Sequence, residues 1–143
     1  VIKGQPFLYA KDAQFIDCTF EQDSSDAYNV WTYGAEKVLF KGCTFNCAGK
    51  AVLIYNEGAL TAGKVEFQDC KFVATAAVSG KAAIEIDCRF TSYNVIIDQA
   101  TANNVTTGFG TGSVSGSSVW NVKQGNKPTT VTVGGTQVYP TNP

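Results

Sequence analysis

The sequence predicts an all-β chain folded as a parallel β-helix, a solenoid of about five coils with three short strands in each coil. Three observations predict this fold class. A short motif recurs along the chain, a further strand pattern precedes each copy, and the composition suits strands and turns. Methionine is absent, whereas Thr, Val, Gly, Asn and Ser are plentiful. The runner-up architecture is a β-sandwich.

The recurring motif has two apolar residues separated by one other residue, a two-residue corner, then a cysteine or small residue and usually a further apolar residue. Its copies begin at positions 13, 38, 65, 95 and 131, which are 25, 27, 30 and 36 residues apart. Such self-similarity is typical of solenoids, in which each unit buries its apolar side only against its neighbours. The copies are 13–20 (AQFIDCTF), 38–45 (VLFKGCTF), 65–72 (VEFQDCKF), 95–102 (VIIDQATA) and 131–138 (VTVGGTQV).

A further strand is expected before each copy. Strands that recur at long offsets pair most simply with their own copies one coil away, and no Asn-Gly or Asp-Gly pair indicates a hairpin. The segments GKAVLIY and GKAAIEI align without a gap, so Leu53 and Tyr55 are expected to point inward with Ile84 and Ile86. The expected strands lie near 7–9, 27–33, 49–55, 80–86 and 118–122.

The segment 84–90 alternates between apolar and charged residues, which is typical of a half-buried strand. Its inward face is expected to carry Ile84, Ile86, Cys88 and Phe90, and its outward face Glu85, Asp87 and Arg89. In the segment 29–33 the register stays open, because a slip of one residue decides whether Val30 or Trp31 faces the core.

The core is expected to contain ladders of residues at equivalent positions of successive copies, stacked about 4.8 Å apart. Buried thiols in such a ladder behave as small hydrophobic groups. The predicted ladder residues are Cys18, Cys43, Cys70, Phe15, Phe40, Phe67, Phe20, Phe45 and Phe72. Five cysteines is an odd number, so at least one is unpaired within the chain. A disulfide between Cys47 and Cys88, which lie off the ladder, stays open.

The length of 143 residues fits one domain over residues 1–143, and we expect it to be the C-terminal part of a longer chain. Eleven basic and twelve acidic residues give a net charge of −1, which offers no electrostatic footprint for nucleic acid. No apolar run approaches the roughly 20 residues of a membrane span. An open edge at Phe7 and a C-terminal edge ended by Pro140 and Pro143 predict a monomer or weak self-association through the N-terminal coil.

The run from Gly49 to Tyr139 carries a family resemblance. Its segments GKAVLIY, KVEFQDCKF, GKAAIEID and SSVWNVKQ, followed by TTVTVGGTQVY, resemble the right-handed parallel β-helix domains of uncharacterised secreted or surface proteins of gut-dwelling bacteria. Those domains belong to the pectate-lyase-like fold, and many are non-catalytic repeats labelled as adhesins. The resemblance therefore implies a right-handed helix and an extracellular or cell-surface setting.

Enzymes of this fold that cleave acidic polysaccharides use outward carboxylates with Ca²⁺ or a catalytic base, and glycoside hydrolysis needs a pair of carboxyl groups. The candidates for such chemistry are Glu85, Asp87, Arg89, Asp17 and Asp69. However, charged residues on an outward strand face ordinarily form a solvated, mutually paired surface. The chain has no histidine and no Asn-Thr-Asp motif of the polygalacturonase kind. We therefore expect no catalysis, no metal and no cofactor, with Ca²⁺ only in the lyase alternative.

Aromatic residues offer a candidate binding site. They are Trp31, Tyr33, Tyr55 and Trp120, which fall in the series of strands that precede the motif copies. Rings that face outward would form a stack suited to sugars or to a partner surface, whereas rings that face inward would belong to the core. The sequence favours an adhesin-like module that binds a glycan or a host or cell-surface protein. The alternatives are a polysaccharide lyase or glycoside hydrolase, and a purely structural spacer.

Overall fold

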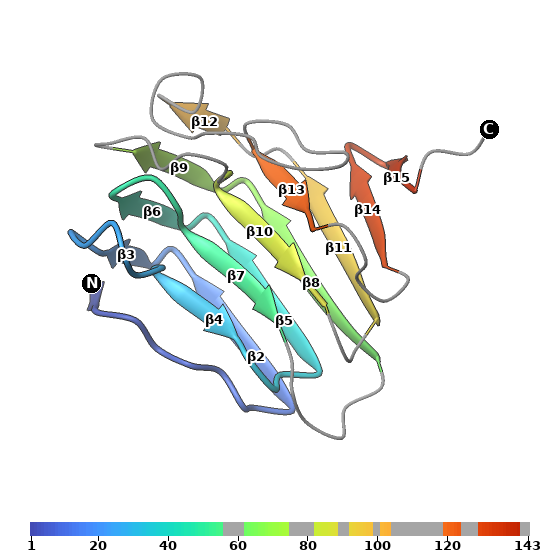
Figure 1. Ribbon diagram of the computed structural model, residues 1–143, viewed down its shortest axis with the longest axis horizontal. Helices are drawn as coiled ribbons and strands as arrows, with labels where there is room; N and C mark the ends of the chain where they lie inside the picture. Colours follow the sequence, from blue (N-terminus) through green and yellow to red (C-terminus); the bar gives the residue numbers. More distant parts are fainter. Residues whose placement is uncertain are drawn as a thin grey trace.

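The chain is all-β. The computed structural model describes residues 1–55, 62–74, 82–88, 92–98, 101–103, 119–123 and 129–140. Within these ranges every regular element is a strand, and the strands form three sheets (Figure 1). Arg89 and Phe90, which the sequence places on the two faces of one strand, lie outside the described residues.

The sheets contain five, four and six strands. Sheet A has the order β1 (Ile2–Lys3), β3 (Thr19–Glu21), β6 (Thr44–Cys47), β9 (Lys71–Ala74) and β12 (Thr101–Asn103). Sheet B has the order β4 (Val30–Thr32), β7 (Val52–Tyr55), β10 (Ile84–Asp87) and β13 (Trp120–Val122). Sheet C has the order β2 (Asp12–Ile16), β5 (Lys37–Lys41), β8 (Ala62–Gln68), β11 (Ser92–Asp98), β14 (Thr130–Val133) and β15 (Thr136–Tyr139).

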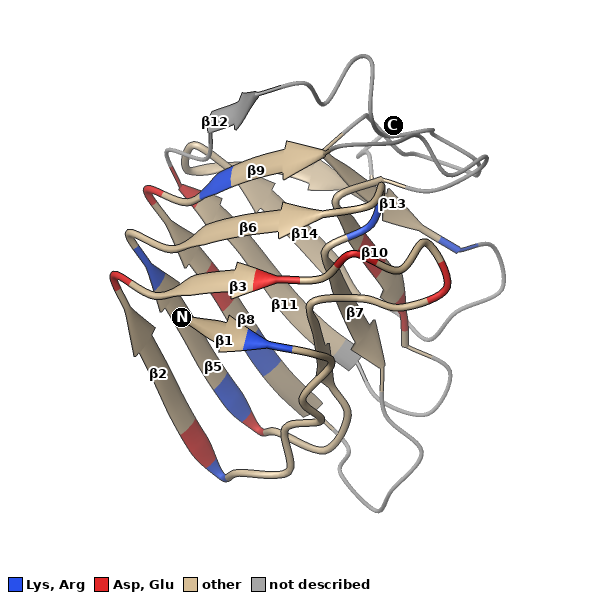
Figure 2. Cartoon of the chain, turned by 90° about the vertical axis from the view of Figure 1, so that its left-hand side faces the viewer, with Lys and Arg blue, Asp and Glu red and all other residues tan. Residues whose placement is uncertain are grey.

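From β2 to β14 the chain visits sheets C, A and B in rotation. Each strand consequently pairs in parallel with the strand of the same sheet that the chain forms on its next passage. Figure 2 looks toward sheet A and shows β3, β6 and β9 stacked in this way, with sheet C beside them. Three parallel sheets of this kind fit the predicted β-helix-like fold.

Phenylalanine columns fill the space inside sheets A and C, as the ladder prediction requires. Strand β5 alternates between exposed or half-buried residues and the fully buried Val38 and Phe40. Phe40 stacks on Phe15 with ring centroids 5.4 Å apart and on Phe67 with centroids 5.2 Å apart. In sheet A, Phe45 stacks in the same manner between Phe20 and Phe72. Because the strands pair in parallel and in register, equivalent phenylalanine rings lie about one strand spacing apart.

The corner between sheets C and A needs a left-handed backbone. Asp17, Gly42 and Asp69 occupy equivalent positions there and have φ values of 53°, 62° and 50°. Aspartate and glycine are the residues that adopt this conformation at low cost, which explains the residue types at this position of the motif. A Cβ on Gly42 would overlap only the tip of the exposed Asp17 side chain, which can turn away, so the left-handed backbone is the main reason for glycine there.

The cysteine that follows each corner packs inward and bonds to the preceding passage of the chain. Cys43 Sγ donates to the carbonyl oxygen of Phe15 at 3.2 Å, and Cys70 Sγ donates to that of Phe40 at 3.3 Å. Cys18, in the first copy, is only half-buried and donates to Ile16 within its own corner. The ladder is therefore fully buried at Cys43 and Cys70 but not at its N-terminal end.

All five cysteines are free thiols, so the disulfide left open between Cys47 and Cys88 is not formed. These two residues, although off the ladder, are as buried as Cys43 and Cys70. Cys47 Sγ donates to the carbonyl oxygen of Val73 and Cys88 Sγ to that of Ile54. Each thiol thus bonds to a neighbouring strand or segment.

The predicted register of sheet B was wrong by one residue. Ile84 pairs with Val52 and Ile86 pairs with Ile54, so the inward residues of β7 are Val52 and Ile54. Leu53 and Tyr55, predicted to point inward, lie opposite Glu85 and Asp87 on the outer face. A slip of one residue exchanges the two faces of a strand, and the gap-free alignment of the two segments missed it. The same pairing resolves the open register of β4, because Val30 pairs with Val52 and faces the core, whereas Trp31 faces outward.

The last copy of the motif departs from the others. Residues 131–138 were predicted to repeat the strand pair of the earlier copies, but β14 and β15 form an antiparallel hairpin within sheet C. The turn residues Gly134 and Gly135 have φ values of 56° and 82°. Two consecutive residues with positive φ make a hairpin turn, and Gly-Gly supplies this as readily as the Asn-Gly pair that the sequence lacks.

Candidate functional site

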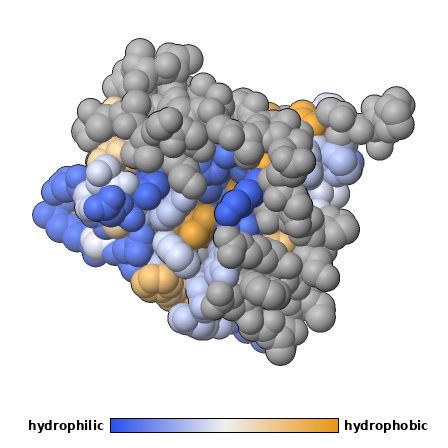
Figure 3. Space-filling view, viewed as in Figure 1, coloured by the Kyte–Doolittle hydropathy of each residue, from blue (hydrophilic) through white to orange (hydrophobic). Residues whose placement is uncertain are grey.

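The outer face of sheet B gathers three of the aromatic candidates, Trp31, Tyr33 and Tyr55, and two of the acidic ones, Glu85 and Asp87. One row across the sheet contains the paired residues Trp31, Leu53, Glu85 and Asn121. The next row pairs Tyr55 with Asp87, and Tyr33 and Lys123 directly follow β4 and β13. The face therefore has an aromatic half over β4 and β7 and a polar half over β10 and β13. Figure 3 looks onto this sheet and shows hydrophobic residues beside hydrophilic ones.

The aromatic half is a cluster separate from the main core. It comprises Tyr28, Trp31, Tyr33, Leu53 and Tyr55. The Trp31 ring lies 6.0 Å from Tyr33 and 5.9 Å from Tyr55, measured between ring centroids, and the planes are tilted or edge-on. Tyr28 and Tyr55 are buried, whereas Trp31 and Tyr33 are half-buried. The half-buried rings consequently pack beside buried rings of the same cluster.

The N-terminal segment extends this cluster along the edge of sheet B. Trp31 N donates to the Pro6 carbonyl oxygen at 3.0 Å, and Leu8 N donates to the Trp31 carbonyl oxygen at 2.9 Å. Alternation then directs Phe7 and Tyr9 to the outer side, where Phe7 lies 5.1 Å from Trp31 and Tyr9 lies 5.2 Å from Tyr33. Phe7 is 46% exposed and Tyr9 is 66% exposed. These two rings are the most accessible aromatic surface of the face.

The chemistry around Tyr28 shows that the two halves are close enough to interact. Lys50 Nζ lies 4.8 Å above the Tyr28 ring, a cation–π contact. Burial raises the pKa of Tyr28, and the negative charges of Glu85 and Asp87 raise it further. Tyr28 stays a neutral phenol well above physiological pH, and its ring contributes shape and the cation–π contact with Lys50.

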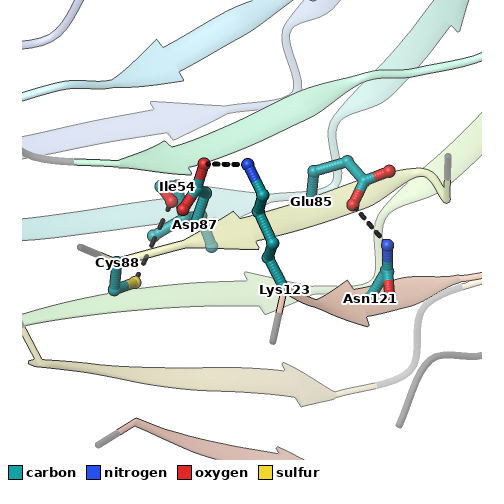
Figure 4. Close-up of polar contacts among 6 residues, drawn as sticks. All are labelled: Ile54, Glu85, Asp87, Cys88, Asn121 and Lys123. Atoms are coloured by element: carbon teal, nitrogen blue, oxygen red, sulfur yellow. Dashed lines mark hydrogen bonds and ion pairs between the residues drawn. The ribbon is translucent and has the colours of Figure 1, made fainter. Parts of the chain in front are cut away.

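The polar half is a set of mutually satisfied groups (Figure 4). Glu85 is only 5% exposed although it points outward. Its Oε1 accepts from Ala82 N at 2.9 Å, and its Oε2 accepts from Asn121 Nδ2 at 2.8 Å. Asp87 Oδ2 lies 3.4 Å from Lys123 Nζ. Both carboxyl groups thus hold neighbouring strands together, the ordinary role of paired charges on a strand face.

The five catalytic candidates are not brought together. Asp17 and Asp69 are exposed corner residues between sheets C and A, and their left-handed backbone explains their presence. Glu85 and Asp87 lie on β10 in sheet B, as the sequence predicted. Arg89, the base that a lyase would use, lies outside the described residues. No group of three or more His, Cys, Asp or Glu residues in the described part of the chain could hold a metal ion.

The four aromatic candidates divide between the two sides of sheet B. Trp31, Tyr33 and Tyr55 lie on the outer face, whereas Trp120 pairs with the inward Ile84 and belongs to the main core. Sequence reasoning missed Phe7, Tyr9, Tyr28 and Lys50 as members of the face. The alternation in 7–9 was the available signal, but it was used only to expect a strand.

One polar atom of the face has no hydrogen-bond partner among the described residues. It is Trp31 Nε1, which is buried, and the neighbouring Asn29 Oδ1 and Thr32 Oγ1 share this property. A buried N–H that makes no hydrogen bond costs stability.

No protein-family model matches the chain, and no curated protein or solved structure is significantly similar to it. The resemblance to bacterial β-helix domains therefore depends on the sequence pattern alone. In the described residues there is no helix that is both long and apolar enough to cross a membrane.

Proposed function

We propose that this chain is a non-catalytic, right-handed parallel β-helix of about five coils that belongs to a bacterial surface or secreted protein. Its role is adhesin-like, and it binds a glycan or a protein partner through the outer face of sheet B. The observation that supports this proposal is the aromatic cluster on that face. Phe7 and Tyr9 are exposed there beside the half-buried Trp31 and Tyr33.

Physical chemistry favours recognition at such a surface. Aromatic side chains present large apolar area with little conformational freedom to lose, which is why they are enriched where proteins bind other molecules. The flat, weakly polar faces of sugar rings pack against such rings. The buried Tyr28 and Tyr55 pack against Trp31, and these contacts restrict the rings before a ligand arrives.

The lyase or hydrolase alternative has less support. Glu85 and Asp87 are the acidic pair on this face, but the Glu85 carboxylate accepts hydrogen bonds on both oxygens and Asp87 is paired with Lys123. A catalytic acid or base needs a carboxyl group that reaches the substrate. The spacer alternative explains neither the exposed Phe7 nor the exposed Tyr9.

A glycan array combined with a polysaccharide-degradation screen tests the proposal. We expect binding to at least one glycan or host surface protein and no release of unsaturated or reducing sugar, with or without Ca²⁺. The double variant Phe7→Ser/Tyr9→Ser should weaken binding at least tenfold. A matched control is Ile16→Ser, which removes an exposed apolar residue from sheet C.

Two results would contradict this proposal. Turnover that is lost in Glu85→Gln or Asp87→Asn would make the chain an enzyme. Absence of any ligand, or binding that Phe7→Ser/Tyr9→Ser leaves intact, would place the role elsewhere.

A further inference from the structure

A pocket lies on sheet C, away from the outer face of sheet B. It has a volume of about 390 Å³ and opens where β8, β11 and β14 begin, beside the final hairpin. Small-molecule sites range from about 300 to 1,000 Å³. We propose that this pocket is a second binding site, for a neutral, hydroxyl-rich ligand the size of one sugar residue. The inference goes beyond the proposed function and does not depend on it.

The apolar part of the pocket is built before any ligand binds. A Cβ on Gly63 would overlap the Tyr93 ring, so the glycine makes room for this ring to lie across β8. Tyr93 Oη donates to the Ala35 carbonyl oxygen at 3.0 Å and thereby fixes the ring. Ala62 and Pro140 complete the apolar lining.

The polar part of the pocket keeps donors and acceptors in fixed positions. The Thr130 hydroxyl donates to Asn94 Oδ1, which holds the amide in one orientation. No group among the described residues accepts a hydrogen bond from Asn94 Nδ2, and Asn94 is exposed. Gln137 Nε2 donates to the Pro140 carbonyl oxygen at 3.3 Å, which leaves Gln137 Oε1 as an acceptor. A ligand hydroxyl, which both donates and accepts, matches this set.

The absence of charge among the described lining residues favours a neutral ligand. None of the described residues that line it is charged. Lys64 lies beside Asn94 in register, but it does not line the pocket, and its Nζ is 3.2 Å from Glu66 Oε2. A carboxylate or phosphate would lose its hydration without gaining a cation in exchange. A neutral sugar loses much less hydration free energy, and its hydroxyl groups can form hydrogen bonds with Asn94 and Gln137.

Titration of the ¹⁵N-labelled chain with five sugars, followed by NMR, tests this site. The probes are glucose, galactose and N-acetylglucosamine as neutral sugars, with glucuronic and galacturonic acids as their charged counterparts. We expect one or more neutral sugars to shift the backbone amide signals of Asn94 and Thr130. Ala62→Trp, which fills the pocket, and Asn94→Leu, which removes the amide, should each weaken that binding at least tenfold.

Controls separate the pocket from the outer face of sheet B. Gln14→Trp adds the same bulk at an exposed position of sheet C and should leave the titration unchanged, as should Phe7→Ser/Tyr9→Ser. If Ala62→Trp does not fold, Asn94→Leu decides. The inference is overturned if no neutral sugar shifts these signals, if neither variant weakens binding, or if the sugar acids bind more tightly than the neutral sugars.

Discussion

The phenylalanine rings inside the molecule and the aromatic rings on the outer face of sheet B pack in different ways. Inside, Phe20 and Phe45 stack with an interplanar angle of 7°, and Phe45 and Phe72 with one of 12°. Outside, Trp31 meets Tyr55 at 71° and Tyr33 meets Tyr55 at 44°. Inner rings repeat with the strands, so the register alone sets their geometry. The outer rings come from several segments that do not repeat, so each pair of rings packs at a different angle.

This difference indicates two uses for the same residue type. An inner ring is enclosed by the neighbouring strands, and its burial stabilises the fold. An exposed outer ring, such as that of Phe7 or Tyr9, contributes less to stability because much of it stays in water. Aromatic residues that contribute little to folding are the ones available for binding. The predictions below test this division.

Among the substitutions, the largest effect on stability is expected for an inner ring. Phe40→Ala should lower the free energy of unfolding by about 3–5 kcal/mol, because it leaves a cavity between Phe15 and Phe67. Tyr9→Ala should change it by only about 0.5 kcal/mol, because Tyr9 is 66% exposed. Urea denaturation measures both values. Similar losses in the two variants would end the distinction between the inner and outer rings.

Alkaline pH should destabilise the fold through the buried thiols. Burial raises the pKa of Cys47 from 9.0 to about 11 and that of Cys88 from 9.0 to about 12. The unfolded chain therefore releases these protons at lower pH than the folded chain. Stability is full below about pH 9 and is lost as pH rises toward 11–12, by up to about 1.4 kcal/mol per pH unit for each thiol.

Urea denaturation at several pH values between 8 and 12 follows this loss. In a Cys47→Ala/Cys88→Ala control the decline above pH 9 should be shallower than in the unchanged chain. An identical decline in both proteins would show that other groups cause it.

A smaller loss of stability is expected at Gly63, where the Tyr93 ring leaves no room for a Cβ atom. Gly63→Ala should cost about 1–3 kcal/mol, because the new Cβ overlaps the Tyr93 ring and displaces its hydroxyl group from Ala35. In a double-mutant cycle with Tyr93→Leu, the combined loss should be smaller than the sum of the single losses. Additive losses would mean that the two residues do not interact.

The smallest perturbation is chemical labelling of the thiols in the native state. Cys18, the only half-buried cysteine, should react first with a polar thiol reagent, whereas Cys43, Cys47, Cys70 and Cys88 should react slowly until the chain unfolds. Mass spectrometry of the labelled peptides gives the rates, and Cys18→Ala should lack the fast phase. Cys47 or Cys88 labelling as rapidly as Cys18 would show that the inner face is open to solvent.

Parts of the candidate face could be read from the sequence and parts could not. The alternation of 84–90 correctly placed Glu85 and Asp87 on one outward face. It did not reveal that Glu85 is buried, because that burial and the bond to Asn121 depend on a strand 36 residues away. Phe7 reaches Trp31 only because segment 6–8 bonds along β4, a pairing between segments about 24 residues apart that no local pattern marks.

The sequence by itself determined the all-β class, the phenylalanine columns, the buried pair Cys43 and Cys70, and the positions of the corners. In these regions most of the residues that alternate with the core positions are polar or charged. In β5, for example, Lys37 and Lys41 bracket the buried Phe40, so only one face can turn inward. The first four copies also keep a constant length, and their sheet C strands pair in the register that the alignment predicts.

Only the tertiary structure decided which side of β7 faces the core. All four residues of β7 are buried and apolar or aromatic, so nothing local distinguishes Val52 and Ile54 from Leu53 and Tyr55. The inward pair is selected by contact with Ile84 and Ile86 on β10, and the outward pair by packing against Trp31 and Tyr28. Because side chains alternate along a strand, this one choice of register created the aromatic face.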